Sequence, residues 1–262
     1  MKKYLFALIC VFSLSHPALA EEKTITLAAD EWCPYNCVPN SEKPGYMVEI
    51  AKAVFEPKGI KINYQVMPWE RAIEDARKGT YDGIIGARVD DAPDFVMPSE
   101  SLGYTTNTFY VKAGSKWQYE GLGSLESVSL GVIDGYSYEK ELDKDISDNS
   151  GHSALIQSIS GDAGLEQNFK KLEQGRIDVY LEDLNVAQKY IADHSLWGKL
   201  KVAGQEVTNV KEHYVYISFS PFIKESRYYA ETLSEGIKEL RASGKLKEIL
   251  DKYNVQDWID KK

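Results

Sequence analysis

Short apolar runs alternate with amphipathic stretches from residue 24 to the end of the chain. The runs 24–29 and 60–66 are typical of strands, and the residues after each run repeat their apolar positions at helical spacing. A further helix is expected to begin near Pro68 and to end at Gly79, where it leads into a third strand over 82–87. This alternation predicts an α/β protein with mostly parallel strands.

A weaker copy of the third unit lies further along the chain. The two segments read EDARKGTYDGIIGAR and KKLEQGRIDVYLED. In both, a helix ends at a glycine (Gly79, Gly175), and an aspartate (Asp82, Asp178) then opens an apolar strand. Two such units suggest two lobes of related architecture, although helix, glycine and strand follow one another in many α/β proteins.

The remaining apolar segments continue this alternation. Strands are expected over 104–111, 128–133 and 213–221, and a helix is expected to open at 135–137. Two helices separated by Gly244 end the chain.

The first twenty residues have the pattern of a secretory signal. Two lysines precede an apolar run over 4–14, and residues 18–20 form a small-residue cleavage site. Cleavage after Ala20 leaves 242 of the 262 residues and removes Cys10. No other apolar run approaches the ~18 residues of a transmembrane helix. We therefore expect a mature chain without a membrane anchor in an oxidising compartment.

Charge and histidine content exclude two kinds of site. Loss of the two signal lysines takes the formal net charge from −9 to −11. Such a surface repels polyphosphate, and the sequence has no basic stripe for nucleic acid. His152, His194 and His213 are scattered, and none pairs with another at metal-ligand spacing. We expect no nucleic-acid partner, no metal and no cofactor.

The segment DEWCPYNC, residues 30–37, holds the two cysteines that remain after cleavage. A thioredoxin-like site has two residues between its cysteines, whereas three separate Cys33 from Cys37, and Pro34 follows the first cysteine. A zinc site needs further Cys or His ligands, which the sequence does not provide. In an oxidising compartment we expect a Cys33–Cys37 disulfide that fixes the loop between them.

Five segments then follow one another along the chain: GYMVEIAKAVF, PWERAIEDARKGTYDGIIGA, SLESVSLGVIDGYSYEKEL, LEQGRIDVYLEDLNVAQKY and GIKELRASGKLKEILDKY. Their order resembles that of the family 3 extracellular solute-binding proteins, the two-lobed periplasmic receptors of polar amino acid ABC transporters. The resemblance implies a periplasmic-binding-protein type II fold, in which each lobe is a mostly parallel sheet flanked by helices. The ligand then lies in the cleft between the lobes.

The resemblance also divides the chain and names a partner. It implies a signal peptide over 1–20, a discontinuous first lobe over 21–107 and 213–262, and a second lobe over 108–212. Closure of the lobes would be a hinge motion about two crossing strands. The family expectation is a periplasmic monomer that delivers its solute to an inner-membrane ABC permease.

Two charged groups should hold a ligand of amino-acid type. The family accepts the ligand's ammonium group with an aspartate that corresponds to Asp183 here. It usually grips the carboxylate with a Thr-x-x-Arg after the third strand, a motif that this sequence lacks. We expect Arg88, which follows Ala87 at the end of that strand, to supply the grip, with Arg71 as the second candidate.

Both expectations have alternatives. If Arg88 does not contact the ligand, it is expected to pair with Asp90 or Asp91 on the surface. The turn at 135–137 offers helix-start N–H groups to an anionic ligand group in the family, but it also fits a plain strand-to-helix turn capped by Ser137. The predicted contacts at this turn are Gly135, Tyr136 and Ser137. Further aromatic and acidic candidates to line the cleft are Tyr35, Trp69, Tyr104, Trp32, Asp30 and Glu31.

Three function classes fit this sequence. We expect a non-enzymatic receptor that captures a small polar solute, an amino acid or a related amine, whose identity the sequence does not fix. The fold also resembles that of periplasmic cyclohexadienyl dehydratases, which would need a general acid or base in the cleft. The candidates for that role, Glu31, Glu182, Asp183 and His213, form no pair or triad in the sequence. A sensory receptor that presents its closed form to a membrane partner would have the same sequence.

Overall fold

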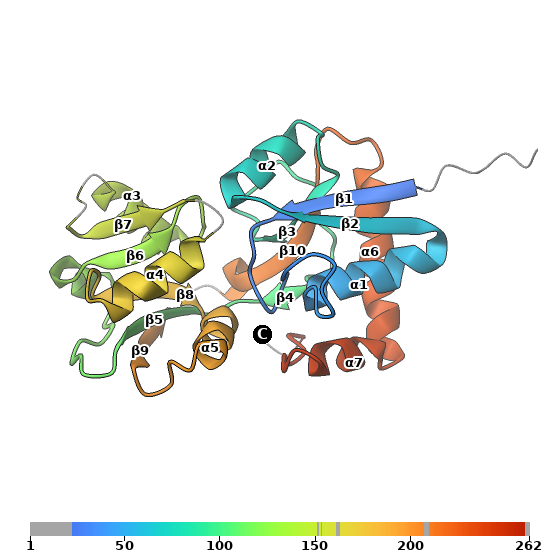
Figure 1. Ribbon diagram of the computed structural model, residues 1–262. Helices are drawn as coiled ribbons and strands as arrows, with labels where there is room; N and C mark the ends of the chain where they lie inside the picture. Colours follow the sequence, from blue (N-terminus) through green and yellow to red (C-terminus); the bar gives the residue numbers. More distant parts are fainter. Residues whose placement is uncertain (1–22, 151, 153, 161–162, 207–209, 260–262) are drawn as a thin grey trace, which may run out of the picture.

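The computed structural model describes residues 23–150, 152, 154–160, 163–206 and 210–259. Within these residues the chain forms two five-stranded sheets, each flanked by helices (Figure 1). The predicted two-lobed α/β fold is confirmed. The expected signal segment, 1–20, lies outside the described residues. In the described part of the chain, no helix combines the length and apolarity needed to cross a bilayer.

The first sheet has the strand order β2-β1-β3-β10-β4. β1 runs parallel to both neighbours, whereas β10 lies antiparallel to β3. The strands are β1 (Lys23–Ala29), β2 (Ile60–Val66), β3 (Gly83–Ala87), β4 (Gly103–Tyr104) and β10 (Tyr214–Phe219). The helices of this lobe are α1 (Tyr46–Phe55), η1 (Glu56–Lys58), α2 (Trp69–Arg77), α6 (Ser226–Ala242) and α7 (Lys245–Asp251). The alternation in β2 arises because every second side chain is buried against the helices.

The second sheet has the equivalent order β7-β6-β8-β5-β9. β6 runs parallel to β7 and β8, and β5 lies antiparallel to β8 and β9. The strands are β5 (Asn107–Lys112), β6 (Leu130–Ile133), β7 (Ile156–Ile159), β8 (Val179–Asp183) and β9 (Leu200–Glu206). The helices are η2 (Leu122–Ser127), α3 (Lys140–Asn149), α4 (Gly164–Glu173), α5 (Leu184–Asp193) and η3 (Val210–His213).

The two lobes repeat one local construction where β3 and β8 begin. Asp82 accepts hydrogen bonds from the backbone N–H and the hydroxyl of Thr26, both at 2.7 Å. Asp178 accepts the same pair from Ser129, at 2.9 and 2.7 Å. The helix before each strand is followed by a glycine with positive φ, as the sequence predicted. The two segments are therefore copies of one unit in the folded chain as well as in the sequence.

Two connections join the lobes and lie side by side. β4 continues into β5 through Thr105 and Thr106, and the return from β9 to β10 includes η3. The Thr105 N–H donates to the carbonyl oxygen of His213 (2.9 Å), and the His213 ring Nδ1 lies 3.1 Å from the Thr105 carbonyl oxygen. β5 begins at Asn107, one residue before the expected start of the second lobe. The lobe limits, 21–107 with 213–262 and 108–212, stay a prediction.

Candidate functional site

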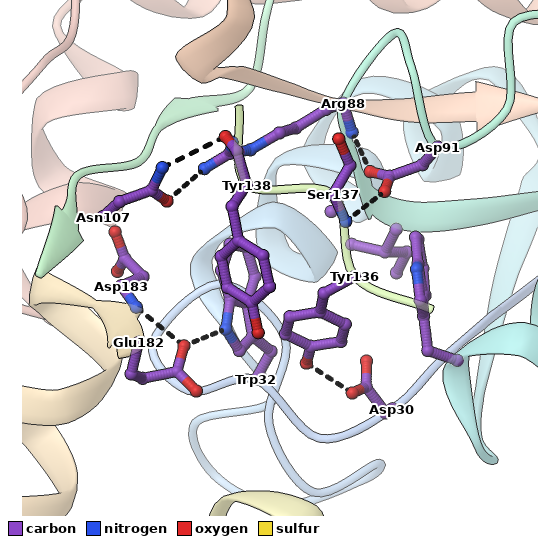
Figure 2. Close-up of a pocket in the computed structure, with 13 residues that line it drawn as sticks. Asp30, Trp32, Arg88, Asp91, Asn107, Tyr136, Ser137, Tyr138, Glu182 and Asp183 are labelled. Carbon is purple, nitrogen blue, oxygen red and sulfur yellow. Dashed lines mark hydrogen bonds between the residues drawn. The ribbon is translucent and has the colours of Figure 1, made fainter. Parts of the chain in front are cut away.

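A pocket lies between the two sheets, where the carboxyl ends of their parallel strands face each other (Figure 2). The first lobe contributes Asp30, Trp32, Trp69, Ile85, Gly86, Arg88 and Asp91. The second lobe contributes Asn107, Tyr136, Ser137, Tyr138, Glu182 and Asp183. The cavity volume is about 30 Å³, room for a water molecule or two. In this arrangement of the lobes the cavity is therefore smaller than an amino acid.

Arg88 follows β3 and lines the pocket with 7% of its surface exposed. Its Nη2 donates to Thr105 Oγ1 (2.7 Å) and Asn107 Oδ1 (2.9 Å), so the first connection between the lobes positions the guanidinium. Its Nη1 is buried without a hydrogen-bond partner. Among the described residues its guanidinium bonds go to these two neutral groups, and the alternative surface pair with Asp90 or Asp91 does not form.

Asp91 connects the two lobes instead. Its carboxylate accepts a hydrogen bond from the backbone N–H of Arg88 (2.6 Å) and, across the cleft, one from the backbone N–H of Ser137 (3.1 Å). Burial raises the pKa of Asp91 to about 7, although the two backbone bonds and the charge of Arg88 act in the opposite direction.

The turn that carries Ser137 does not open a helix. α3 begins at Lys140, so the predicted helix start at 135–137 is wrong. The carboxylate of Asp143, in the first turn of α3, accepts a hydrogen bond from the Ser137 hydroxyl (2.8 Å) and another from the Tyr138 N–H (2.7 Å). These bonds hold the turn in a non-helical shape. Ser137 therefore neither caps a helix nor presents helix-start N–H groups.

Tyr136 lies in the middle of the pocket, between aromatic side chains of the other lobe. Its hydroxyl donates to Asp30 Oδ2 (2.5 Å). Its ring lies edge-on to Trp32 and to Trp69, with centroids 6.3 Å away in both cases. Burial, followed by the charges of Asp30 and Glu182, raises the pKa of Tyr136 well above its ordinary value. Two carboxylates therefore lie close to one phenol.

Glu182 is a buried carboxyl at the end of β8. It accepts hydrogen bonds from the Tyr180 hydroxyl (2.5 Å), from the Asp183 N–H (2.8 Å) and, across the cleft, from Trp32 Nε1 (3.1 Å). Burial raises its pKa to about 7 against the effect of these donors. Trp32, one of the aromatic candidates named from the sequence, thus lines the pocket directly.

Asp183 lines the pocket, but its carboxylate also has a structural role. Oδ1 accepts from the backbone N–H groups of Asn185 (2.9 Å) and Val186 (3.1 Å), so Asp183 is the N-cap of α5. Oδ2 accepts from the N–H of Thr106 (2.8 Å), in the first connection between the lobes. Burial raises its pKa, and these bonds oppose the rise. Its ligand role stays a prediction.

Other predicted residues lie away from the pocket lining. The Arg71 side chain is 70% exposed and pairs with Asp75 on the surface of α2. Tyr35 is fully buried beneath Trp32, with ring centroids 4.2 Å apart. The other such residues are Ala87, which is buried within β3, Gly135, which is exposed before Tyr136, and Tyr104, whose ring lies against His213.

The cysteines form the predicted disulfide. Cys33 and Cys37 are joined, and the closed loop contains Pro34, Tyr35 and Asn36. Asn36 Nδ2 donates to the carbonyl oxygen of Asp30 (2.5 Å), so the bridged loop is tied to the pocket-lining segment before it.

Of the acid and base candidates, Glu182 and Asp183 line the pocket, whereas Glu31 and His213 are not among its lining residues. His213 is fully buried between the two connections, where its Nε2 contacts the Glu139 carboxylate. Burial lowers the pKa of His213, and the bond to Glu139 opposes this shift. Glu31 lines a separate hollow with Cys33 and Lys189, and partial burial raises its pKa. Over the described residues, no group of three or more His, Cys, Asp or Glu side chains is arranged to hold a metal.

Asn107, Asp91 and Tyr138 line the pocket, although the sequence did not assign them to it. Asp91 had a usable signal, because it follows closely after a strand that ends at the cleft. Asn107 and Tyr138 had none, because their positions depend on how the second lobe meets the first. The Tyr138 carbonyl accepts from Asn107 Nδ2 (3.1 Å), which in turn orients Asn107 Oδ1 toward Arg88.

Comparison with solved structures shows the same fold in proteins of low sequence identity. A structure from a study of glutathione import through GshT and the cystine ABC importer TcyBC of Streptococcus mutans has a TM-score of 0.73 at 20% identity, covering 89% of this chain and 95% of that chain. An ancestral arginine-binding protein bound to arginine has a TM-score of 0.68 at 19% identity, covering 88% and 97%. A histidine kinase sensor domain with similarity to periplasmic binding proteins has a TM-score of 0.68 at 18% identity, covering 88% and 96%.

Sequence comparison identifies the family. No curated protein matches this chain. Residues 25–256 match the family described as bacterial extracellular solute-binding proteins, family 3. That match spans both lobes and every residue of the pocket lining. This chain therefore belongs to the bacterial extracellular solute-binding proteins of family 3.

Proposed function

We propose that this protein captures a small amine-bearing solute of amino-acid type between its lobes and delivers it to an ABC permease. The observation that carries the proposal is Arg88, a guanidinium held in the interlobe pocket by Thr105 and Asn107 with its Nη1 buried and unpartnered. A buried donor without a partner costs about 1 to 3 kcal/mol, so an incoming acceptor is favoured there.

The ligand's carboxylate is the acceptor that suits Arg88. Because Nη2 already donates to Thr105 and Asn107, Nη1 is the nitrogen that would donate to the carboxylate, and each charge-assisted bond contributes about 1.5 to 3 kcal/mol. Arg88 thereby supplies the grip that the family usually obtains from Thr-x-x-Arg. It does so from the strand end itself, and Asn107 of the second lobe helps to fix its direction.

The ligand's ammonium group suits the acidic side of the pocket. Asp30, Asp91, Glu182 and Asp183 line it, against one arginine. A buried carboxylate is costly without a positive counterpart, and the donors to Glu182 and Asp91 are neutral groups. An amine relieves this cost, and the faces of Trp32 and Trp69 add an attraction for a cation.

The contacts that cross the cleft would break when a solute enters. The pairs Ser137–Asp91, Tyr136–Asp30 and Trp32–Glu182 each join one lobe to the other. Opening breaks these bonds around the two connections near Thr105 and His213, and closure on the solute buries it. The affinity for the permease then depends on which of the two shapes the protein adopts.

The setting of this cycle is proposed from the family and the sequence together. Family members are extracellular solute-binding proteins. The signal pattern over 1–20 and the disulfide support export to the periplasm, where a monomer would meet an inner-membrane permease. A neighbouring structure named for an ABC importer supports the kind of partner.

One observation favours a second candidate, a dehydratase-type enzyme. Glu182 has a pKa of about 7 inside a cleft, which is the property of a general acid. Against this, three donors already bind its oxygens, and neither the buried His213 nor any lysine lines the pocket. We therefore rank the receptor first.

A thermal screen distinguishes the two candidates. Protein is unfolded and refolded to remove bound solute, then heated with single amino acids, polyamines and organic acids. A ligand at 100 times its Kd adds about 2.7 kcal/mol of stability, which raises Tm by about 5 to 10 °C. If the protein is a receptor, at least one amine-bearing solute raises Tm by this amount, and the solute is not converted into a product. No rise with any compound contradicts it, and turnover of prephenate or arogenate favours the enzyme.

A further inference from the structure

Tyr136 reaches from the second lobe into the pocket between the lobes. Its phenol lies edge-on to both Trp32 and Trp69, and its hydroxyl donates to Asp30, a carboxylate of the other lobe (Figure 2). The side chain also packs against the hydrophobic cores of both lobes. One residue of the second lobe thus makes an apolar contact and a polar contact with the first.

Two further bonds cross the cleft beside it. Trp32 Nε1 donates to Glu182 (3.1 Å), and the Ser137 N–H donates to Asp91 (3.1 Å). In all three bonds the donor is a neutral group and the acceptor is a carboxylate that lines the pocket. These carboxylates are the groups that a ligand's amine needs.

These carboxylates cannot accept the bonds that cross the cleft and bind a ligand's amine in full at the same time. While the phenol is in place, the cavity volume is about 30 Å³, less than any amino acid requires. A ligand in this position must displace the Tyr136 ring from the tryptophans and its hydroxyl from Asp30. Bonds to charged acceptors contribute about 1.5 to 3 kcal/mol each, enough to shift an open-to-closed equilibrium by about tenfold or more.

We propose that Tyr136 is an affinity-determining residue of the proposed solute site: its phenol joins the two lobes through Asp30, and a ligand must displace it. This inference rests on the proposed function. The form in which the phenol bonds to Asp30 competes with the ligand, so the measured affinity equals the intrinsic affinity multiplied by the fraction of protein that is open. Weakening the Tyr136 contact raises that fraction and strengthens binding.

The deciding experiment needs no ligand. The separation of the lobes is measured in refolded protein by small-angle X-ray scattering. It is also measured as the distance between two probes, one on each lobe, attached by chemistry that does not use cysteine. Tyr136→Phe removes the hydroxyl and keeps the ring, and we expect a larger mean separation than in the parent. Tyr110→Phe is the matched control, because Tyr110 lies in the core of the second lobe, away from the pocket lining, and its hydroxyl is buried without a hydrogen-bond partner among the described residues. Equal separation in the parent and in Tyr136→Phe overturns the proposal.

A calorimetric titration with L-arginine adds the affinity. We expect Tyr136→Phe to bind this probe about three- to tenfold more tightly than the parent, in line with the loss of one bond to a charged group. An affinity for L-arginine that is unchanged or weaker in Tyr136→Phe overturns the proposal. If neither protein binds L-arginine, the result counts against the proposed preference for amines, and the lobe separation still decides the role of Tyr136.

Discussion

Arg88 is the residue on which the account of the site depends most. A guanidinium with 7% exposure is expensive to bury, and Thr105 and Asn107 satisfy only one of its two terminal nitrogens. Structural arginines are usually paired with carboxylates, whereas the two partners here are neutral. This arrangement supports the proposal that Arg88 binds an anionic group of the ligand, with Thr105 and Asn107 fixing its direction.

Replacing Arg88 tests this directly. We expect Arg88→Gln to weaken solute binding by at least about 100-fold, because the charge-assisted bonding of Nη1 and the positive charge of the guanidinium are both lost. Arg71→Gln is the matched control, since that arginine is exposed and pairs only with Asp75 among the described residues. Titration calorimetry with the strongest compound from the thermal screen measures both. Equal losses in the two variants would show that neither arginine grips the solute specifically.

Asp183 should affect stability as well as binding. Its carboxylate caps α5 and holds the Thr106 N–H, so truncation leaves three backbone donors without their acceptor. Loss of an N-cap alone costs about 0.5 to 2 kcal/mol, and we expect Asp183→Ala to lose about 2 kcal/mol or more in urea unfolding. Asp193→Ala, at the exposed end of α5, is the comparison. If Asp183→Ala keeps the parental stability, its carboxylate has no structural role.

The bridged loop shows how one element shapes the site at a distance. The disulfide closes Cys33 to Cys37, Tyr35 packs beneath Trp32, and Trp32 bonds to Glu182 across the cleft. A loop this short stabilises the fold by only about 2 kcal/mol in the chain-entropy model. We therefore expect the disulfide to act mainly by fixing the position of Trp32.

The double variant Cys33→Ser, Cys37→Ser tests that expectation. We predict a loss of about 2 kcal/mol in urea unfolding, together with about tenfold weaker solute binding because Trp32 is less fixed. Binding at parental strength would mean that the bridge serves stability alone. Adding a reductant to the parent should reproduce the binding of the double variant.

Element patterns predicted most of the fold but less of the site. The helix ends at Gly79 and Gly175, and the strand starts after Asp82 and Asp178, could be predicted because they depend on residues that are close in the sequence. β7 was missed because four residues give too little pattern, and β9 was missed although its residues partly alternate. The false helix start at 135–137 has a local cause that apolar periodicity does not show: the Asp143 carboxylate, in the first turn of α3, accepts hydrogen bonds from Ser137 and Tyr138.

The same distinction separates Arg88 from Arg71. α2 buries Trp69, Ala72, Ile73 and Ala76, a helical period that places Arg71 on the outer face. Periodicity alone therefore argued against Arg71. The bonds of Arg88 to Thr105 and Asn107 could not be predicted, because they depend on how the chain passes between the lobes.

At the scale of the whole molecule, the acidic cleft should make stability depend on pH. Asp91 and Glu182 have pKa values near 7, above those of the unfolded chain, so the folded protein binds more protons between about pH 4.5 and 7. Stability without ligand therefore falls as the pH rises through this window. We expect the parent to lose about 2 kcal/mol more than Glu182→Gln between pH 5 and pH 8.

Urea unfolding at the two pH values measures this difference. Comparing variants cancels the contribution of other groups, such as His213, whose lowered pKa acts with the opposite sign. Glu235→Gln is the control, because this side chain is exposed on α6. Parallel pH profiles for the parent and Glu182→Gln would contradict the buried, proton-holding state of Glu182.

The central claim is that the two lobes enclose one solute of amino-acid type between Arg88 and the cleft carboxylates. Titration calorimetry of refolded protein with the amine-bearing compound that most raises Tm tests it most directly. The account predicts saturable binding of one molecule per chain with no product formed. A titration that shows no saturable heat with any compound of the screen, or more than one equivalent site per chain, would contradict it.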